Sequence, residues 1–256
     1  MLRRLVVHAG FHKTGTSTLQ KTLAAHRDLL SPHTGVVLRD DMRDLCEAAR
    51  TFSVSRSEFN LGLVAYEAAR LAEAWTQSTM ILSSEDLSGH MPGRKGLTAY
   101  DATPALVARM NDTWRLACPH ADVTWIYTTR AAAGWLRSCY AQHLRVMRMT
   151  LEAQEYEQRY AGSADLNGII ALVRQRGADV LTLPLETHGA DLTAPVLASA
   201  GVPPEVAARV HPVPPANTAP GADGLAALLA LNRSGLSGGD LRAAKSALRK
   251  ARKTRT

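Results

Sequence analysis

Short apolar runs alternate along the chain with longer segments in which apolar residues recur at helical spacing. The runs at residues 4–9, 35–38, 79–83, 122–129 and 180–183 predict strands, because they are brief and rich in branched and aromatic side chains. Helices are predicted between and after them, at residues 16–26, 61–75, 103–118, 131–149, 166–176, 192–200, 205–210, 225–231 and 241–253. This alternation predicts an α/β fold, a three-layer sandwich with a mainly parallel central sheet and additional C-terminal helices.

The composition is that of an ordinary globular chain of 256 residues, with 46% hydrophobic and 21% charged residues. Prolines and glycines around residues 212–221 interrupt the periodic pattern, so we expect a main domain over residues 1–218 and a helical extension over residues 219–256. The net charge is +7, and residues 239–256 alone carry seven basic residues against one aspartate. The main domain is therefore nearly neutral, and the extension ends in a basic tail.

The three cysteines, Cys46, Cys118 and Cys139, are scattered and form no CxxC pair. This favours reduced thiols and a cytoplasmic location over a disulfide framework, and it gives no sign of a metal site. The apolar run after Arg3 and Arg4 is shorter than the core of a secretory signal. No run approaches the roughly 18 apolar residues of a membrane span.

A glycine-bearing turn, GFHKTGTST at residues 10–18, joins the first predicted strand to the first predicted helix. Unpaired backbone N–H groups and the helix dipole make such a helix N-terminus an anion site. The glycines let the backbone approach a phosphate, and the hydroxyls of Thr16, Ser17 and Thr18 can cap the helix or donate to phosphate oxygens. The glycine spacing is that of a Walker A loop, but Thr16 stands where the lysine is required and Lys13 lies inside the loop.

This loop resembles the 5′-phosphosulfate loop of sulfotransferases that use 3′-phosphoadenosine 5′-phosphosulfate (PAPS), above all bacterial carbohydrate-type enzymes. The resemblance covers residues 5–218 and implies a P-loop NTPase-like fold, with PAPS as co-substrate, PAP as product and no metal. It implies that Lys13, Thr14, Gly15, Thr16, Ser17 and Thr18 bind the co-substrate. Lys13 would also be catalytic, by stabilising charge on the leaving oxygen. The alternative is a glycine turn that binds no ligand.

A second part of the pattern lies at Arg130, directly after a predicted strand, and at Ser138, eight residues later on the next predicted helix. An arginine can grip a phosphate bidentately, and a serine hydroxyl adds a donor. In the family these positions hold the 3′-phosphate of PAPS, although Ala131 and Ala132 replace the usual Asp-Pro. The alternative is an arginine paired with a surface acid and a serine that faces solvent.

A third part is Glu85, which follows the predicted strand at residues 79–83 and resembles the catalytic glutamate of the family. A carboxylate there could take the proton from an attacking hydroxyl. His12 and His90 are rival bases, and His12 could also touch the transferring group, whereas His8 lies inside a strand. Alternatively, Glu85 and Asp86 only begin a turn. Weaker similarities are the strand-end Glu186 and the segment at residues 216–218.

The resemblance implies a sulfotransferase that moves a sulfuryl group from PAPS to a hydroxyl of a carbohydrate or glycolipid. Two other functions stay open. One is a P-loop nucleotide kinase or ATPase with a displaced lysine, which would need Mg²⁺ and a strand-end aspartate such as Asp86. The other is a non-catalytic protein that binds an anionic polymer through the basic tail. We expect no specific nucleic-acid partner, and the tail could contact an anionic acceptor or membrane surface, or be a solvated helix.

Overall fold

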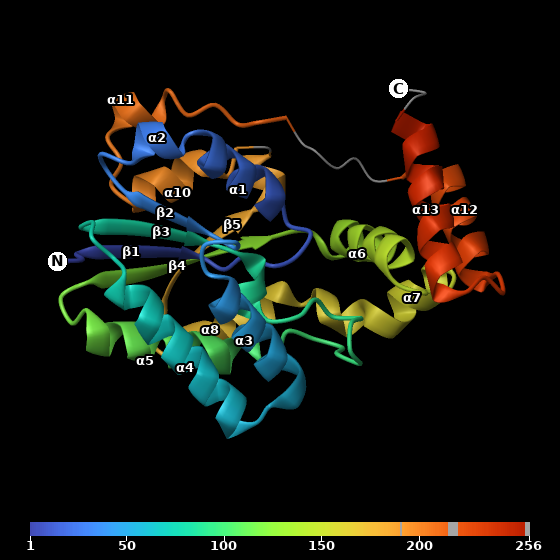
Figure 1. Ribbon diagram of the computed structural model, residues 1–256, viewed down its shortest axis with the longest axis horizontal. Helices are drawn as coiled ribbons and strands as arrows, with labels where there is room; N and C mark the ends of the chain where they lie inside the picture. Colours follow the sequence, from blue (N-terminus) through green and yellow to red (C-terminus); the bar gives the residue numbers. More distant parts are fainter. Residues whose placement is uncertain (190, 215–219, 254–256) are drawn as a thin grey trace.

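The computed structural model describes residues 1–189, 191–214 and 220–253. Within them, five parallel strands form one sheet in the order β2-β3-β1-β4-β5 (Figure 1). The strands are β1 (Arg4–His8), β2 (Gly35–Leu38), β3 (Thr79–Ser83), β4 (Asp122–Thr129) and β5 (Asp179–Pro184). The α/β prediction is therefore confirmed, and the predicted strands agree with these bounds to within one residue at either end.

The longer helices match most of the predicted segments. They are α1 (Thr16–Ala25), α3 (Arg43–Ser55), α4 (Glu58–Glu73), α5 (Thr103–Ala117), α6 (Ala132–Val146), α7 (Ala153–Tyr160), α8 (Leu166–Gln175), α10 (Thr193–Ser199), α12 (Ala222–Arg233) and α13 (Gly238–Lys253). Shorter turns of helix are α2 (Arg27–Leu30), η1 (Glu85–Ser88), η2 (Ala161–Ala164), α9 (Leu185–His188) and α11 (Pro204–Ala207). Neither α3 nor α7 was predicted from the sequence, although Leu45, Cys46, Ala49 and Phe52 of α3 recur at helical spacing and are buried.

Helices cover both faces of the sheet, because side chains along a strand point alternately to opposite sides. On β1, Leu5 and Val7 join a core formed with α3, α4, α5 and α8, whereas Val6 joins a second core formed with α1, α2 and α10. Figure 1 shows these two groups of helices below and above the sheet. All three β1 residues are fully buried, which explains why this strand is a continuous apolar run.

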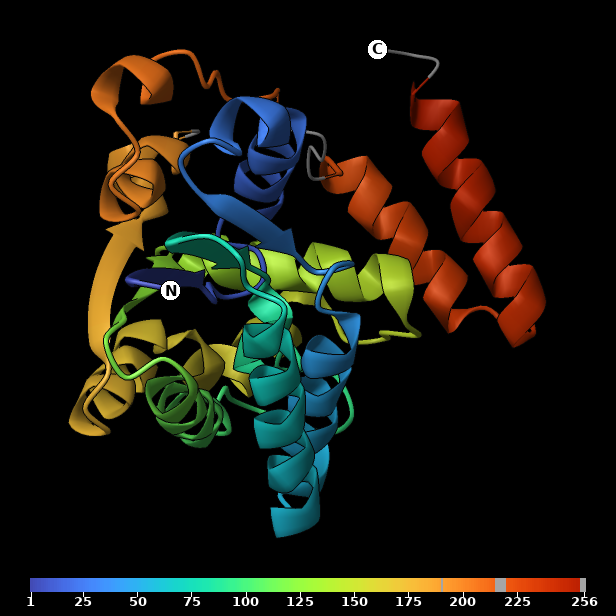
Figure 2. The same cartoon turned by 60° about the vertical axis from the view of Figure 1, so that its left-hand side comes forward.

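The C-terminal helices α12 and α13 lie as an antiparallel pair beside α6, away from the sheet (Figure 2). Asn232 Nδ2 of α12 donates to the Leu144 carbonyl of α6 at 3.0 Å. Lys245 Nζ of α13 donates to the Met147 carbonyl, just after α6, at 2.8 Å. The extension is thus fixed to α6.

The predicted domain boundary, and the segment at residues 216–218, lie outside the described residues. Among the helices that the structure describes, none combines the length and hydropathy that a membrane span requires.

The sheet order places β1 between β3 and β4. In register, Val7 of β1 lies beside Leu82 of β3 and Trp125 of β4. Because the three strands are parallel, their carboxyl ends meet at one edge of the sheet, where open α/β sheets bind their ligands. The loop after β1, Glu85 after β3 and Arg130 after β4 are therefore brought to the same edge, although the sequence separates them widely.

Candidate active site

The loop between β1 and α1 has an unusual backbone. Gly10, Lys13 and Gly15 have positive φ angles of 43°, 72° and 95°. A Cβ on Gly10 would lie 2.8 Å from Thr16 Cγ2, and one on Gly15 would lie 2.8 Å from Leu192 Cδ1, so both positions require glycine. Lys13 has no such freedom and adopts the left-handed region as a bulky residue, which is a form of strain that clusters at functional sites.

The hydroxyls of this loop do not all point the same way. Thr14 is buried, its Oγ1 donates to the Phe11 carbonyl at 2.6 Å, and it shares a 2.5 Å hydrogen bond with Thr128 Oγ1. Its side chain is therefore turned into the protein, and only its backbone remains for the predicted binding role. The N-cap of α1 is Gly15, with no side-chain cap, so the predicted capping by hydroxyls is wrong. Ser17 is exposed, so its hydroxyl is available to a ligand.

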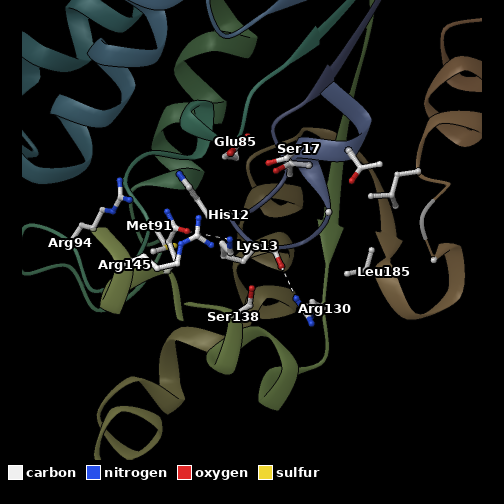
Figure 3. A pocket seen from close by; sticks show the side chains of 16 residues that line it. His12, Lys13, Ser17, Glu85, Met91, Arg94, Arg130, Ser138, Arg145 and Leu185 are labelled. Carbon is white, nitrogen blue, oxygen red and sulfur yellow. Dashed lines mark hydrogen bonds between the residues drawn. The ribbon is translucent and has the colours of Figure 1, made fainter. Parts of the chain in front are cut away.

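A cavity of about 540 Å³ opens at this edge of the sheet (Figure 3). It is lined by His12, Lys13, Gly15, Thr16, Ser17, Thr18, Glu85, Met91, Arg94, Arg130, Ser138, Gln142, Arg145, Leu185, Gly189 and Leu192. Every site residue that the sequence predicted is among them except Thr14. The lining also includes Arg94, Gln142 and Arg145, which the sequence analysis missed. Gln142 and Arg145 follow Ser138 by four and seven positions, so helical spacing could have placed them on the same face of α6.

Positive charge dominates this cavity. Lys13, Arg94, Arg130 and Arg145 line it against the one carboxylate of Glu85. In the part of the chain that the structure describes, none of these four cations forms an ion pair with a carboxylate. Burial, followed by the nearby charge of Arg145, lowers the pKa of Lys13. An anionic ligand would offset both the burial of Lys13 and its repulsion by Arg145, because the ligand would place a negative charge beside these buried cations.

Arg130 and Ser138 reach the cavity from β4 and α6. Arg130 Nη1 donates a long hydrogen bond of 3.4 Å to the Lys13 carbonyl, which ties it to the loop. A Cβ on Gly134 would lie 3.2 Å from Arg130 Nε, so this glycine leaves room for the guanidinium. The predicted alternative, an ion pair between Arg130 and a surface acid, is not formed with any described residue.

The start of α6 is stabilised by a side chain from another part of the chain. The backbone N–H of Ala131, the N-cap residue, donates to Glu186 Oε1 at 2.8 Å. A carboxylate at a helix N-terminus is favoured by the helix dipole. Hydrogen bonds from the Ala131 and Glu186 backbones accordingly lower the pKa of Glu186. The strand-end glutamate therefore holds the helix that carries Ser138.

Glu85 begins the helical turn η1 directly after β3 and lines the cavity. Gln20 Nε2 of α1 donates to Glu85 Oε2 at 2.7 Å, which fixes the carboxylate relative to the loop. Among the described residues, no hydrogen-bond partner binds the other carboxylate oxygen, Oε1. Glu85 is thus oriented by one oxygen and can accept a proton from a ligand with the other.

His12 is held from both sides. The Tyr100 hydroxyl accepts from the His12 backbone N–H at 3.1 Å and lies 2.9 Å from Nδ1, while Nε2 lies 3.4 Å from Asp86 Oδ1. This pattern fits a ring whose Nδ1 accepts from Tyr100 and whose Nε2–H faces Asp86. Both ring nitrogens are then engaged, so His12 is better placed to position the loop than to take a proton from a ligand.

Asp86 is buried, and two arginines and His12 contact its carboxylate. Its Oδ2 accepts from Arg39 Nε at 2.6 Å, and Arg50 Nη1 lies 3.8 Å from the same oxygen. Burial by itself would raise the pKa of Asp86, but the hydrogen bonds from His12 and Arg39 and the charge of Arg50 outweigh burial and hold the pKa well below its usual range. Asp86 does not line the cavity, so it is not placed to hold a metal ion there.

His90 and His8, the other two histidines considered above, lie outside the cavity. His90 does not line the cavity, and burial, with the charges of Arg50 and Arg94, lowers its pKa to about 4. His8 is fully buried in β1, its Nδ1 lies 2.7 Å from Ser83 Oγ, and burial lowers its pKa to about 4. Their placement removes both from contact with a ligand in this cavity, as the sequence analysis expected for His8 alone.

No protein-family model matches the chain, and no curated protein matches it. Among solved structures, the chain is similar to a sulfotransferase from Alicyclobacillus acidocaldarius, with 18% sequence identity and a TM-score of 0.49. The similarity covers 97% of this chain and 99% of that chain. A likeness at this level does not establish a shared family or activity, so the function must be inferred from the residues of the cavity.

Proposed function

We propose that the protein is a sulfotransferase that transfers a sulfuryl group from PAPS to an acceptor hydroxyl. The observation that carries this proposal is the cavity at the N-terminus of α1, where Lys13 and Arg130, two cations without ion-pair partners among the described residues, meet the oriented carboxylate of Glu85. A ligand with anionic groups at two separated points matches this arrangement. PAPS is such a ligand, because it has a phosphosulfate at one end of its ribose and a phosphate on the other side.

The residues present fit this co-substrate. Backbone N–H groups of Gly15, Thr16 and Ser17, together with the exposed hydroxyl of Ser17, would bind the 5′-phosphate at the helix N-terminus, whereas the Thr18 N–H donates to the Gly15 carbonyl at 3.1 Å. Arg130 and Ser138 would bind the 3′-phosphate, since they reach the same cavity from β4 and α6. These two phosphates together distinguish PAPS from ATP.

The chain's own groups would then carry the chemistry. The acceptor oxygen attacks the sulfur, its proton passes to the Glu85 carboxylate, and a new O–S bond forms. The S–O bond to the 5′-phosphate breaks, and its electron pair stays on the phosphate oxygen of PAP. Lys13 would stabilise the negative charge that grows on that oxygen. Transfer of this kind depends mainly on positioning and on electrostatic stabilisation.

The acceptor class belongs to the same proposal. We infer a hydroxyl on a carbohydrate or glycolipid, on the strength of the loop's similarity to carbohydrate-type sulfotransferases. A metal is not required by the chemistry, because the cavity cations supply the positive charge that Mg²⁺ supplies in phosphoryl transfer. The rival kinase would need Asp86 at the metal, and that carboxylate is occupied by Arg39 and His12 outside the cavity.

The test is calorimetric titration of the full chain with PAP in the absence of metal, compared with ATP plus Mg²⁺. We expect PAP to bind more tightly than Mg-ATP, and Arg130→Ala to weaken PAP by about 100-fold, the scale of losing a charged bidentate contact. Arg137→Ala is the matched control, because Arg137 is exposed on the same helix and does not line the cavity. Preference for Mg-ATP, or an Arg130→Ala variant that binds PAP normally, would refute the proposal.

A further inference from the structure

The cavity has two sides, and the proposed co-substrate accounts for only one of them. Arg130 and Leu185 lie on one side of Lys13, whereas Met91, Arg94 and Arg145 lie on the other, and Ser138 lies below Lys13 between them (Figure 3). Arg130 and Ser138 are the groups assigned to the 3′-phosphate. The two arginines of the second side are left without a role in binding PAPS.

Arg94 is held in place by a built turn. In the segment after η1, the Gly93 N–H donates to the Leu97 carbonyl at 2.7 Å, and the Leu97 N–H donates to the Arg94 carbonyl at 2.9 Å. Gly93 has a φ of 91°, and a Cβ there would lie 2.3 Å from His143 Cε1 of α6. The turn is therefore packed directly on α6. Arg94 is half-buried and lines the cavity from this turn, rather than from a loose loop.

Arg145 lines the cavity from α6, two helical turns after Ser138. The C-terminal extension adds positive charge near it. Lys245 Nζ contacts the Met147 carbonyl, and Arg249 lies one turn further along the same face of α13. Burial, followed by the charge of Arg249, lowers the pKa of Arg145. Arg145 therefore has another cation, Arg249, as a neighbour. No carboxylate among the described residues forms an ion pair with Arg145.

An acceptor that enters this side of the cavity removes water from Arg94 and Arg145. A neutral sugar would leave two half-buried guanidinium groups without counter-charge, which is unfavourable. A carboxylate or sulfate on the acceptor would pair with them and could accept two parallel hydrogen bonds from either guanidinium. The electrostatics of the cavity therefore discriminate against neutral acceptors as well as favouring charged ones.

We propose that the acceptor is an anionic sugar, whose carboxylate or sulfate group is bound by Arg94 and Arg145 while its hydroxyl faces Glu85. This inference rests on the proposed function and names its substrate class. The basic helix α13 then continues the positive surface beyond Arg145, so that the extension serves acceptor binding rather than only ending the chain.

The experiment is calorimetric titration of the PAP-saturated full chain with three probes. They are methyl β-glucoside, methyl β-glucuronide, and methyl β-glucoside with a sulfate on its primary hydroxyl. We expect one or both anionic probes to bind at least about 10-fold more tightly than the neutral one, the scale of one charge-assisted contact. The anionic probe that binds more tightly shows whether the acceptor group bound by Arg94 and Arg145 is a carboxylate or a sulfate.

The same titrations are made with Arg94→Gln, Arg145→Gln and the control Arg137→Gln. We expect each of the first two substitutions to weaken the anionic probe about 10-fold while PAP affinity changes less than about threefold, and the control to leave both affinities unchanged. Equal affinity for neutral and anionic probes, absence of binding by the anionic probes, or a preference that survives both substitutions would overturn the inference. A wild-type chain that does not bind PAP would instead refute the proposed function, so the two failures are distinguishable.

Discussion

Asp86→Asn removes the charge that balances a cluster of cations behind the candidate site. The aspartate is buried and lies 2.6 Å from Arg39 Nε, 3.4 Å from His12 Nε2 and 3.8 Å from Arg50 Nη1. An asparagine of the same shape can still accept a hydrogen bond, but it takes one counter-charge away from Arg39 and Arg50. Arg39 is then left with Glu47 and Asp40, and Arg50 is left with Glu47. A hydrogen bond to a charged group contributes about 1.5–3 kcal/mol, and removal of a partner costs more when the remaining charge is buried.

The exposure of the partners limits this cost. The Arg39 side chain is 43% exposed and can be rehydrated, whereas the His12 side chain is only 14% exposed. We therefore expect Asp86→Asn to lower the free energy of unfolding by about 2 kcal/mol, below the 3–5 kcal/mol of a fully buried pair. For a chain of this length this corresponds to a fall of about 4–8 °C in Tm.

The effect depends on pH in a defined direction. The folded protein holds the pKa of Asp86 below its usual value, so the stabilisation is complete above about pH 4, the ordinary pKa of an aspartate, and is lost as pH falls through the lowered folded pKa. The difference between wild type and Asp86→Asn should therefore be full at neutral pH and shrink in strong acid.

Urea unfolding of both proteins from about pH 7 down to about pH 3 measures this difference. Asp101→Asn is the matched control, because Asp101 pairs with Arg56 at the surface and such pairs contribute about 1 kcal/mol or less. Equal stability of wild type and Asp86→Asn at neutral pH would refute the reasoning. So would a difference that grows as the pH falls, because the sign of the linkage would then be wrong.

Three further predictions concern the cavity. Lys13→Ala should lower turnover at least about 100-fold, measured as PAP release from PAPS with the sugar that binds best; unchanged turnover would contradict its role at the leaving oxygen. Glu85→Gln should keep PAP affinity in calorimetry but lower turnover by about 100-fold or more, and full activity would exclude this carboxylate as the base. Gly15→Ala should weaken PAP by about 10-fold or more, because its Cβ would lie 2.8 Å from Leu192 Cδ1 and its φ is 95°. Gly177→Ala, at a φ of 79° in open space, measures the cost of the backbone angle alone.

The fold and the ends of its strands could be predicted from the sequence because they depend on local patterns. Brief apolar runs specified each strand of the sheet, and the glycine spacing specified the loop before α1. Since parallel strands share one carboxyl edge, these local features were enough to predict that Lys13, Glu85 and Arg130 meet. The eight-residue interval from Arg130 to Ser138 is also local, because one strand end and one helix carry both residues.

Tertiary structure alone decided which way the side chains face and which cations join the cavity. Thr14 is turned inward by Thr128, and His12 is fixed by Tyr100 and Asp86, through contacts between residues far apart in the chain. Arg94 reaches the cavity because Gly93 packs on His143. Such contacts depend on packing between elements, which local periodicity does not encode. The charge balance of the cavity, from which the anionic acceptor is inferred, therefore emerged only with the fold.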